Sequence, residues 1–327
     1  METLSNLFAV VLDRVFEGAV LPAVYAFGLM TYAEMAFDAT ELFLIGVIEV
    51  SLMAIIFGAM EAWWPVEQWT GRKAVRVDVI YTLLNRLGLV ALLLFFLLTP
   101  LVDALDGWLR LHDIIFPKLE DFIPVLIRHP FASLMLYVVI LDFVGYWLHR
   151  WQHRFGPWWA LHSLHHSQRQ MGFWTDNRNH LLDDFLIDGC FAIVALVIGV
   201  QPGQFIMIVV ATRVLQSLAH ANVRLSFGAV GERILVSPRF HRLHHAIGAG
   251  HEGPKRGCNF AVLFPIWDII FRSADFNAEY HPTGIRDQLE GHDYGEGFWR
   301  QQRLGVKRLI AALTIRSFSA SQHKTPS

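Results

Sequence analysis

Eight histidines fall into three short groups whose spacing suits a metal site. The groups are His149 and His153; His162, His165 and His166; and His241, His244 and His245. In a helix, residues three and four positions apart share one face, with Cβ atoms about 5–6 Å apart, so each group can direct several imidazoles into one cavity. Imidazole suits zinc, copper, iron and nickel, and one zinc normally takes three or four protein ligands. Eight imidazoles therefore predict two metal ions.

The first histidine group directly follows an apolar stretch, residues 131–148. As a helix, this stretch covers about 27 Å at 1.5 Å per residue. The hydrocarbon core of a bilayer is about 30 Å thick. We therefore expect the metal site at the membrane surface, where this helix leaves the bilayer.

The composition is that of a membrane protein. Hydrophobic residues make up 54% of the 327 residues, and charged residues only 17%, against roughly 25% in typical globular proteins. These values exclude a disordered chain and a coiled coil. The net charge of −2 provides no field that would attract nucleic acid. Cys190 and Cys258 are too few for an iron–sulfur cluster or a disulfide scaffold.

Hydropathy predicts an all-α integral membrane bundle. Four apolar stretches have about the length needed to cross a bilayer, at residues 20–37, 42–60, 79–98 and 131–148. Two shorter stretches, 185–200 and 204–219, flank a Gln-Pro-Gly turn signal and predict a short helical hairpin, which either crosses the membrane or stops within it. The fold expected is thus about four transmembrane helices, the hairpin and a histidine-rich di-metal helical region.

The distribution of Lys and Arg predicts the orientation. The loop 63–78 and most of the chain after residue 148 are rich in these residues, whereas the segment 101–130 is not. Because Lys and Arg accumulate in cytoplasmic loops, we expect 101–130 on the far side and the histidines on the cytoplasmic face. A bacterial inner membrane is the preferred location, with the endoplasmic reticulum expected if the source is eukaryotic.

With these motifs, the chain resembles the fatty acid hydroxylase and sterol desaturase superfamily of integral-membrane di-iron enzymes. The three histidine groups match its HxxxH and two HxxHH motifs. Further matches are the segments WWALHSLHHSQ (158–168), His220-Ala-Asn222 and NFAVLFPIWDIIF (259–271). The resemblance implies two iron ions held by the eight histidines, with zinc as the metal that could replace them on purification.

The resemblance also implies a reaction and partners. O2 and two electrons would be used to hydroxylate, or less often desaturate, a lipid such as a fatty acyl chain or sterol. The sequence contains no recognisable flavin, iron–sulfur or cytochrome module, so the electrons are expected from a reductase with ferredoxin or cytochrome b5. The domains expected are an N-terminal membrane region (1–130), a catalytic domain (131–275) and a polar, basic C-terminal tail (276–327).

Three further residues are candidates around the metals. His180 and His220 are each either an additional metal ligand or a supporting or structural residue. Asp142 precedes His149 by seven residues and shares its helical face. It either accepts a hydrogen bond from a ligand imidazole, which would fix that ring's tautomer, or it is a polar residue satisfied within the bundle.

Two other functions fit part of the pattern. A non-catalytic metal-binding or metal-transporting membrane protein would also need buried histidines, but transporters place their ligands near the membrane midplane, and these histidines lie outside the apolar stretches. A zinc-dependent membrane hydrolase could activate water, but neither HxxHH group contains the glutamate that such chemistry commonly uses. Both remain alternatives to the lipid oxygenase.

Overall fold

The described part of the chain folds into helices and connecting loops. The structure, a computed structural model, describes residues 2–71, 73–114, 118–200, 202–250 and 257–322. In these ranges, the one β pairing is an isolated bridge between Ala246 and Thr283. The predicted all-α class is confirmed.

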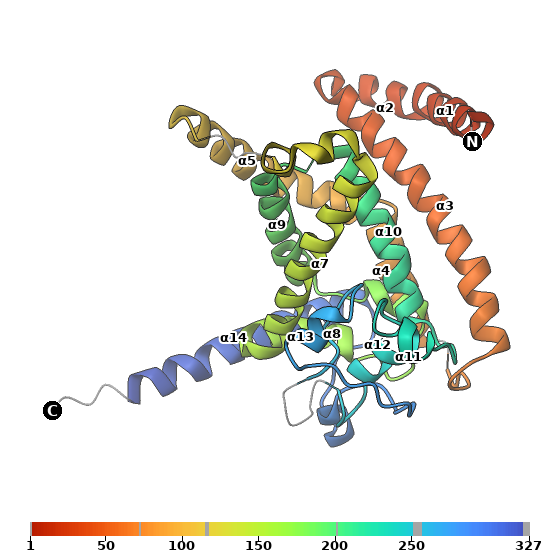
Figure 1. Cartoon of the computed structure of the whole chain (residues 1–327), viewed down its shortest axis with the longest axis vertical. Helices are drawn as coiled ribbons and strands as arrows, with labels where there is room; N and C mark the ends of the chain where they lie inside the picture. The colour runs from red at the N-terminus through yellow and green to blue at the C-terminus, as the bar shows by residue number, and fades with distance from the viewer. Residues whose placement is uncertain (1, 72, 115–117, 201, 251–256, 323–327) are drawn as a thin grey trace.

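Among the described residues, three helices are long and apolar enough to cross a membrane. They are α3 (Ala33–Trp63), which a 3-10 turn extends back to Met30, α5 (Leu89–Leu111) and α7 (Pro130–Arg154). The two stretches of the predicted hairpin form helices α9 (Leu181–Ile198) and α10 (Pro202–His220). Helix α10 contains an apolar segment, Ile206–His220, that is shorter than the three candidate spans. The position Gln201, in the predicted turn, lies outside the described residues. Helices α3, α7, α9 and α10 run along the long axis of the molecule (Figure 1).

Two of the four predicted spans have different boundaries in the structure. The range 20–37 is interrupted at Gly28, whose φ of +68° ends the preceding helix, and the long helix α3 contains the whole range 42–60. The range 79–98 is divided at Gly88, whose φ is +80°. A left-handed glycine ends a helix without a steric penalty, which average hydropathy does not detect.

The remaining helices gather at the two ends of the bundle. At the end opposite the histidines lie α1 (Glu2–Val15), η1 (Phe16–Val20), α2 (Leu21–Ala26), η2 (Met30–Tyr32), α6 (Leu119–Phe122) and η3 (Pro124–Arg128). At the histidine end lie α4 (Lys73–Arg86), α8 (Gly156–His166), η4 (Phe173–Asn177), α11 (Gly228–Gly231), α12 (Pro238–His244), α13 (Ile266–Ile270), η5 (Arg286–Glu290) and α14 (Phe298–Gln322). Helix α14 extends sideways from the bundle (Figure 1).

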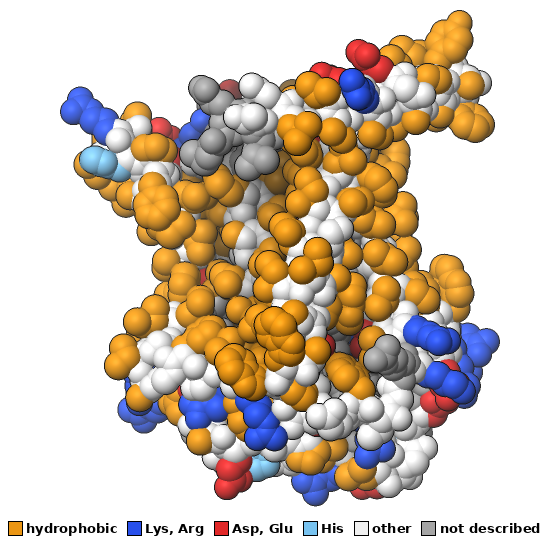
Figure 2. Space-filling view, turned by 90° about the vertical axis from the view of Figure 1, so that its right-hand side faces the viewer, with side chains coloured by type: hydrophobic (Ala, Val, Ile, Leu, Met, Phe, Trp, Pro, Cys, Tyr) orange, Lys and Arg blue, Asp and Glu red, His pale blue; other side chains and the backbone are white. Residues whose placement is uncertain are grey.

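The surface is divided in the same way. On the face that Figure 2 shows, hydrophobic side chains cover the middle of the molecule, and many of the Lys and Arg side chains gather around the histidine end. Exposed apolar side chains on the spans include Ile55, Phe96 and Val139. An apolar surface across the middle of the molecule is what a bilayer requires.

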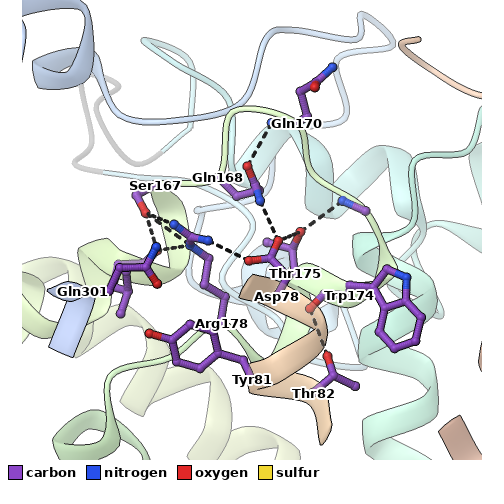
Figure 3. A network of polar contacts seen from close by, with 12 residues as sticks. Asp78, Tyr81, Thr82, Ser167, Gln168, Gln170, Trp174, Thr175, Arg178 and Gln301 are labelled. Carbon is purple, nitrogen blue, oxygen red and sulfur yellow. Dashed lines mark hydrogen bonds and ion pairs between the residues drawn. The ribbon is translucent and has the colours of Figure 1, made fainter. Parts of the chain in front are cut away.

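A buried polar network fixes the histidine end. Asp78 of α4 accepts hydrogen bonds from Arg178 (2.6 Å), Gln168 (2.6 Å) and Thr175 (3.2 Å) (Figure 3). Arg178 also contacts the hydroxyl of Ser167, the residue after the last histidine of α8. A buried charge pair is stable only when its remaining hydrogen-bonding groups are satisfied, and this network ties α8 to α4.

Candidate metal centre

Nine histidines converge at the end of the bundle. One set of four is His149, His153, His162 and His166, and a second set is His165, His220, His241 and His245; in each set the ligand atoms lie within 4.8 Å of one another. His244 forms a smaller group with His166 and His245. The structure thus brings together all eight histidines of the three motifs and adds His220.

Helix geometry explains how the two sets are separated. His149 and His153 are one turn apart on α7, with ring centroids 5.2 Å apart. On α8, the adjacent residues His165 and His166 point into different sets. His166 stacks on His245, with ring centroids 4.2 Å apart. The HxxHH spacing therefore lets one helix contribute histidines to both sets, because adjacent residues on a helix project about 100° apart.

Hydrogen bonds determine the tautomers of four rings. Nδ1 of His149 donates to the carbonyl of Phe260 (2.8 Å), and Nδ1 of His244 donates to the carbonyl of Cys258 (2.7 Å). Nδ1 of His220 similarly donates to the carbonyl of Gln216 (2.8 Å). A carbonyl oxygen can only accept, so Nδ1 carries the proton and Nε2 presents its lone pair. Nδ1 of His162 donates in the same way to the carboxylate of Asp183 (3.0 Å).

The nitrogens of the second set lie at metal-ligand spacing. Nε2 of His220 is 3.1 Å from Nε2 of His165 and 3.0 Å from Nε2 of His241, which is 3.2 Å from Nε2 of His245. Two imidazole nitrogens bound to one metal at about 2.0–2.1 Å would be about 2.9–3.4 Å apart in tetrahedral or octahedral geometry. The donor set therefore fits a metal ion.

Burial keeps these imidazoles in the state that binds metal. The pKa values of His165, His241 and His245 are lowered well below the usual value, first by burial and then by the neighbouring histidines. Burial disfavours the charged imidazolium, and so does a nearby like charge. The rings are consequently neutral near pH 7, as metal ligation requires.

Comparison with known proteins shows which family contains this arrangement of histidines. Residues 134–273, which contain all nine converging histidines, match the fatty acid hydroxylase family. This segment belongs to the fatty acid hydroxylase family. No solved structure matches the chain.

The relatives of this hydroxylase segment are enzymes of lipid oxidation. The chain is 27% identical over 300 residues to the ornithine lipid hydroxylase OlsE of Rhizobium tropici, covering 88% of this chain and 85% of that protein. It is 30% identical over 143 residues to the alkylglycerol monooxygenase of Caenorhabditis elegans, but this match covers only 26% of that protein. A Delta(7)-sterol 5(6)-desaturase of Gibberella zeae is 23% identical over 155 residues, or 47% of its length. The predicted oxidoreductase class is confirmed.

Asp183 is the main supporting residue that the sequence analysis missed. It lies in the first turn of α9 and accepts hydrogen bonds from His162 Nδ1 (3.0 Å), Trp158 Nε1 (2.7 Å) and Gln152 Nε2 (2.9 Å). One carboxylate thereby joins α7, α8 and α9 of the hydroxylase segment. An acid in the first turn of a helix is common, so Asp183 gave no signal beyond its nearness to the motifs.

The hypothesis that Asp142 supports a ligand imidazole is wrong. Asp142 accepts hydrogen bonds from the backbone N–H groups of Leu263 and Phe264 and from Nε1 of Trp267. The alternative, a polar residue satisfied within the fold, is therefore the correct one. Asp142 acts on the metal site only indirectly, since it holds the segment that follows Phe260.

The other end of that segment is held by Asp268. Its carboxylate accepts hydrogen bonds from the backbone N–H groups of Phe260 (3.0 Å) and Ala261 (2.8 Å) and from the Ser273 hydroxyl (2.6 Å). Burial raises the pKa of Asp268 to about 6. Because the carbonyl of Phe260 orients His149, Asp268 positions the acceptor of one of the converging imidazoles.

His180 is not part of either histidine set, which corrects its place among the predicted metal ligands. Its Nδ1 accepts from the backbone N–H of Leu182 at the start of α9, and its Nε2 donates to the carbonyl of Gln302 in α14. A Cβ on Gly305 would overlap the His180 ring. Since both ring nitrogens are used, His180 caps α9 and packs against α14.

A cavity of about 810 Å³ adjoins the histidines. Its lining includes converging histidines such as His149, His162 and His220, several charged and amide side chains, and apolar residues of α7, α9 and α10. Ligand pockets commonly have volumes of about 300–1,000 Å³. The cavity therefore has the volume of a ligand pocket and lies next to the histidine sets.

Proposed function

We propose that the protein is a membrane-bound di-iron monooxygenase that hydroxylates a lipid. The observation that carries this proposal is the convergence of two sets of four histidines beside a largely apolar cavity. The family match and the lipid-oxidising relatives support the same reaction. Desaturation is the less favoured outcome, although one relative is a sterol desaturase.

The nine converging histidines would hold the metals, with iron as the expected ion. The catalytic domain would extend over residues 131–275, with residues 1–130 as its membrane region and 276–327 as a basic tail. Iron and zinc both suit imidazole. Iron is preferred here because the oxidation of an alkyl C–H bond requires a redox-active metal, and zinc has no redox chemistry.

The reaction converts a C–H bond, O2, two electrons and two protons into a C–OH group and water. When bound, iron would supply the activation of O2 that no amino-acid side chain can supply. The chain's residues have other tasks. Carbonyls and Asp183 orient the imidazoles, and the buried site excludes bulk water from the reacting carbon. The electrons would come from a separate reductase with ferredoxin or cytochrome b5.

The proposed location is a bacterial inner membrane, with the histidine end facing the cytoplasm. The many Lys and Arg side chains around that end (Figure 2) support this orientation, because such residues accumulate on the cytoplasmic side. Single-cysteine labelling in intact cells tests the orientation. A residue of loop 63–78 should react only after the membrane is opened.

Metal analysis tests the proposed function most directly. Protein purified in mild detergent should contain two irons per chain, and His165→Ala/His244→Ala should lose them together with O2-dependent lipid hydroxylation. The matched control is His112→Ala/His129→Ala, which removes two exposed histidines outside both sets. Zinc alone in active protein would instead support a hydrolase, and bound metal that crosses the membrane without lipid oxidation would support a transporter.

A further inference from the structure

Helix α14 carries an exposed apolar stripe at the histidine end. This α14 stripe consists of Trp299, Val306, Ile310 and Leu313, whose exposed fractions range from 37% for Val306 to 78% for Trp299. The four residues stand at positions i, i+7, i+11 and i+14, which a helix places within about 60° of one another. An apolar stripe along one side of a helix normally packs against another surface. The described part of the chain leaves this stripe largely uncovered.

Other sides of α14 hold the helix against the histidine end. The side chain of Gln302 accepts a hydrogen bond from the backbone N–H of Leu181 (2.9 Å), at the start of α9. On the side opposite the α14 stripe, the guanidinium of Arg308 lies 4.1 Å from the ring centroid of Tyr294. The α14 stripe therefore faces away from the loop that contains Tyr294.

Helix α14 crosses the bundle where the exposed apolar side of α9 begins. Helix α9 runs along the long axis of the molecule, whereas α14 extends sideways (Figure 1). Leu182, Leu186 and Ile193 are exposed and stand at positions i, i+4 and i+11 on one side of α9. Leu182 directly follows Leu181, which Gln302 of α14 binds. Helix α14 thus lies at the boundary between the apolar middle of the molecule and its polar end.

Cations and tryptophans mark the same boundary. Arg303 and Lys307 are exposed and project about 40° and 80° from Trp299, along one edge of the α14 stripe. Exposed tryptophans also end two of the candidate spans, with Trp64 directly after α3 and Trp151 in the last turn of α7. Tryptophan is enriched at membrane–water interfaces, and Lys and Arg beside an apolar stripe attract anionic lipids.

We propose that α14 lies on the bilayer surface at the histidine end and binds anionic phospholipid head groups. The α14 stripe would enter the boundary between head groups and acyl chains, and Arg303 and Lys307 would contact lipid phosphates. A second copy of the chain would also cover an apolar stripe, but the cations along its edge favour an anionic surface. This inference concerns membrane binding and does not rest on the proposed reaction.

Spin labels test where the α14 stripe lies. Ile310→Cys places a label in the stripe, and the matched Ala311→Cys places one on the adjacent exposed side, both in a Cys190→Ala/Cys258→Ala background. The full chain is placed in nanodiscs of phosphatidylcholine and phosphatidylglycerol. Electron paramagnetic resonance measures collisions of each label with O2, which concentrates in the bilayer, and with a water-soluble nickel complex. The ratio of O2 to nickel collisions should be severalfold higher at position 310.

Charge variants test the anionic preference without any change of cysteine. The relative association of spin-labelled phosphatidylglycerol and phosphatidylcholine with the full chain gives this preference. Each basic residue near an anionic surface contributes about fivefold to binding, so Arg303→Gln/Lys307→Gln should lower the preference at least about twofold. The control Arg169→Gln/Arg286→Gln removes two exposed cations outside α14 and should keep the wild-type preference. Melting temperatures check that each variant is folded.

Three results would overturn the inference. Frequent nickel collisions at both labelled positions would place the α14 stripe in water. Few collisions with either reagent at position 310 would show that protein, such as a second copy of the chain, covers the stripe. An unchanged phosphatidylglycerol preference in Arg303→Gln/Lys307→Gln would exclude head-group binding by these cations.

Discussion

The carboxylate of Asp183 lies 3.0 Å from Nδ1 of His162, between two helices that are separate in sequence. Asp183 also accepts hydrogen bonds from Trp158 and Gln152, so three side chains share its two oxygens. Nδ1 of His162 therefore carries the proton, and Nε2 points toward the first histidine set. This is a carboxylate–histidine arrangement of the kind that supports metal sites.

Asp183→Asn should reduce metal affinity or lipid hydroxylation by about 10- to 100-fold, because the amide is a weaker acceptor and leaves His162 free to turn. Elemental analysis and a metal titration with a competing chelator measure the change. Asp38→Asn is the control, since it removes an exposed carboxylate from α3. Unchanged metal affinity in Asp183→Asn would show that Asp183 only joins the helices.

His220 and His180 should respond oppositely to substitution. His220→Ala removes a nitrogen 3.0 Å from His241 Nε2 and should lower the metal content of the second set. His180→Ala should keep the full metal content and lower the melting temperature, because it removes the cap of α9 and the contact with Gln302. Loss of metal in His180→Ala with an unchanged melting temperature would contradict this assignment.

Asp268→Ala should destabilise the protein by about 3 kcal/mol or more, since it leaves two buried backbone N–H groups and the Ser273 hydroxyl without their acceptor. Thermal unfolding in mild detergent measures this loss. Metal affinity should fall as well, because the Phe260 carbonyl, which orients His149, would no longer be fixed. Ser273→Ala, which removes one donor and leaves both backbone contacts, should have a smaller effect on both properties.

Arg86 should be essential to stability through its two carboxylate partners. It contacts Glu49 of α3 and Asp176 of η4, and it also donates to Ser217 of α10. Arg86→Met would leave both carboxylates buried without their cation, at a cost of about 3–5 kcal/mol. Adding Glu49→Gln should recover part of this loss in unfolding measurements. Equal melting temperatures for Arg86→Met and the exposed control Arg128→Met would rule out this role.

The metal-free protein should become less stable as the pH falls below about 6.5, the usual pKa of histidine. The pKa values of His165, His241 and His245 are lowered in the folded protein, so the unfolded chain binds more protons in this range. Stability is therefore fully present above pH 6.5 and declines toward the lower folded pKa values. Melting temperatures of chelator-treated protein at several pH values measure the decline, which His165→Ala/His241→Ala should reduce.

Local sequence patterns identify which residues could form the site. The three histidine groups are local patterns, and the helical repeat alone places residues three and four apart on one face. The all-α class and the apolar spans likewise follow from composition and hydropathy. These properties depend on short stretches of chain, so they are readable without knowledge of the fold.

The way in which these residues are combined depends on contacts between distant parts of the chain. The tertiary structure assigned His165 and His166 to different sets, added His220, excluded His180 and gave the orienting role to Asp183 rather than Asp142. It also divided two of the predicted spans, one at Gly28 and the other at Gly88. Each of these outcomes depends on contacts between helices far apart in sequence, where hydrogen-bonding partners and close packing, rather than local periodicity, select one arrangement.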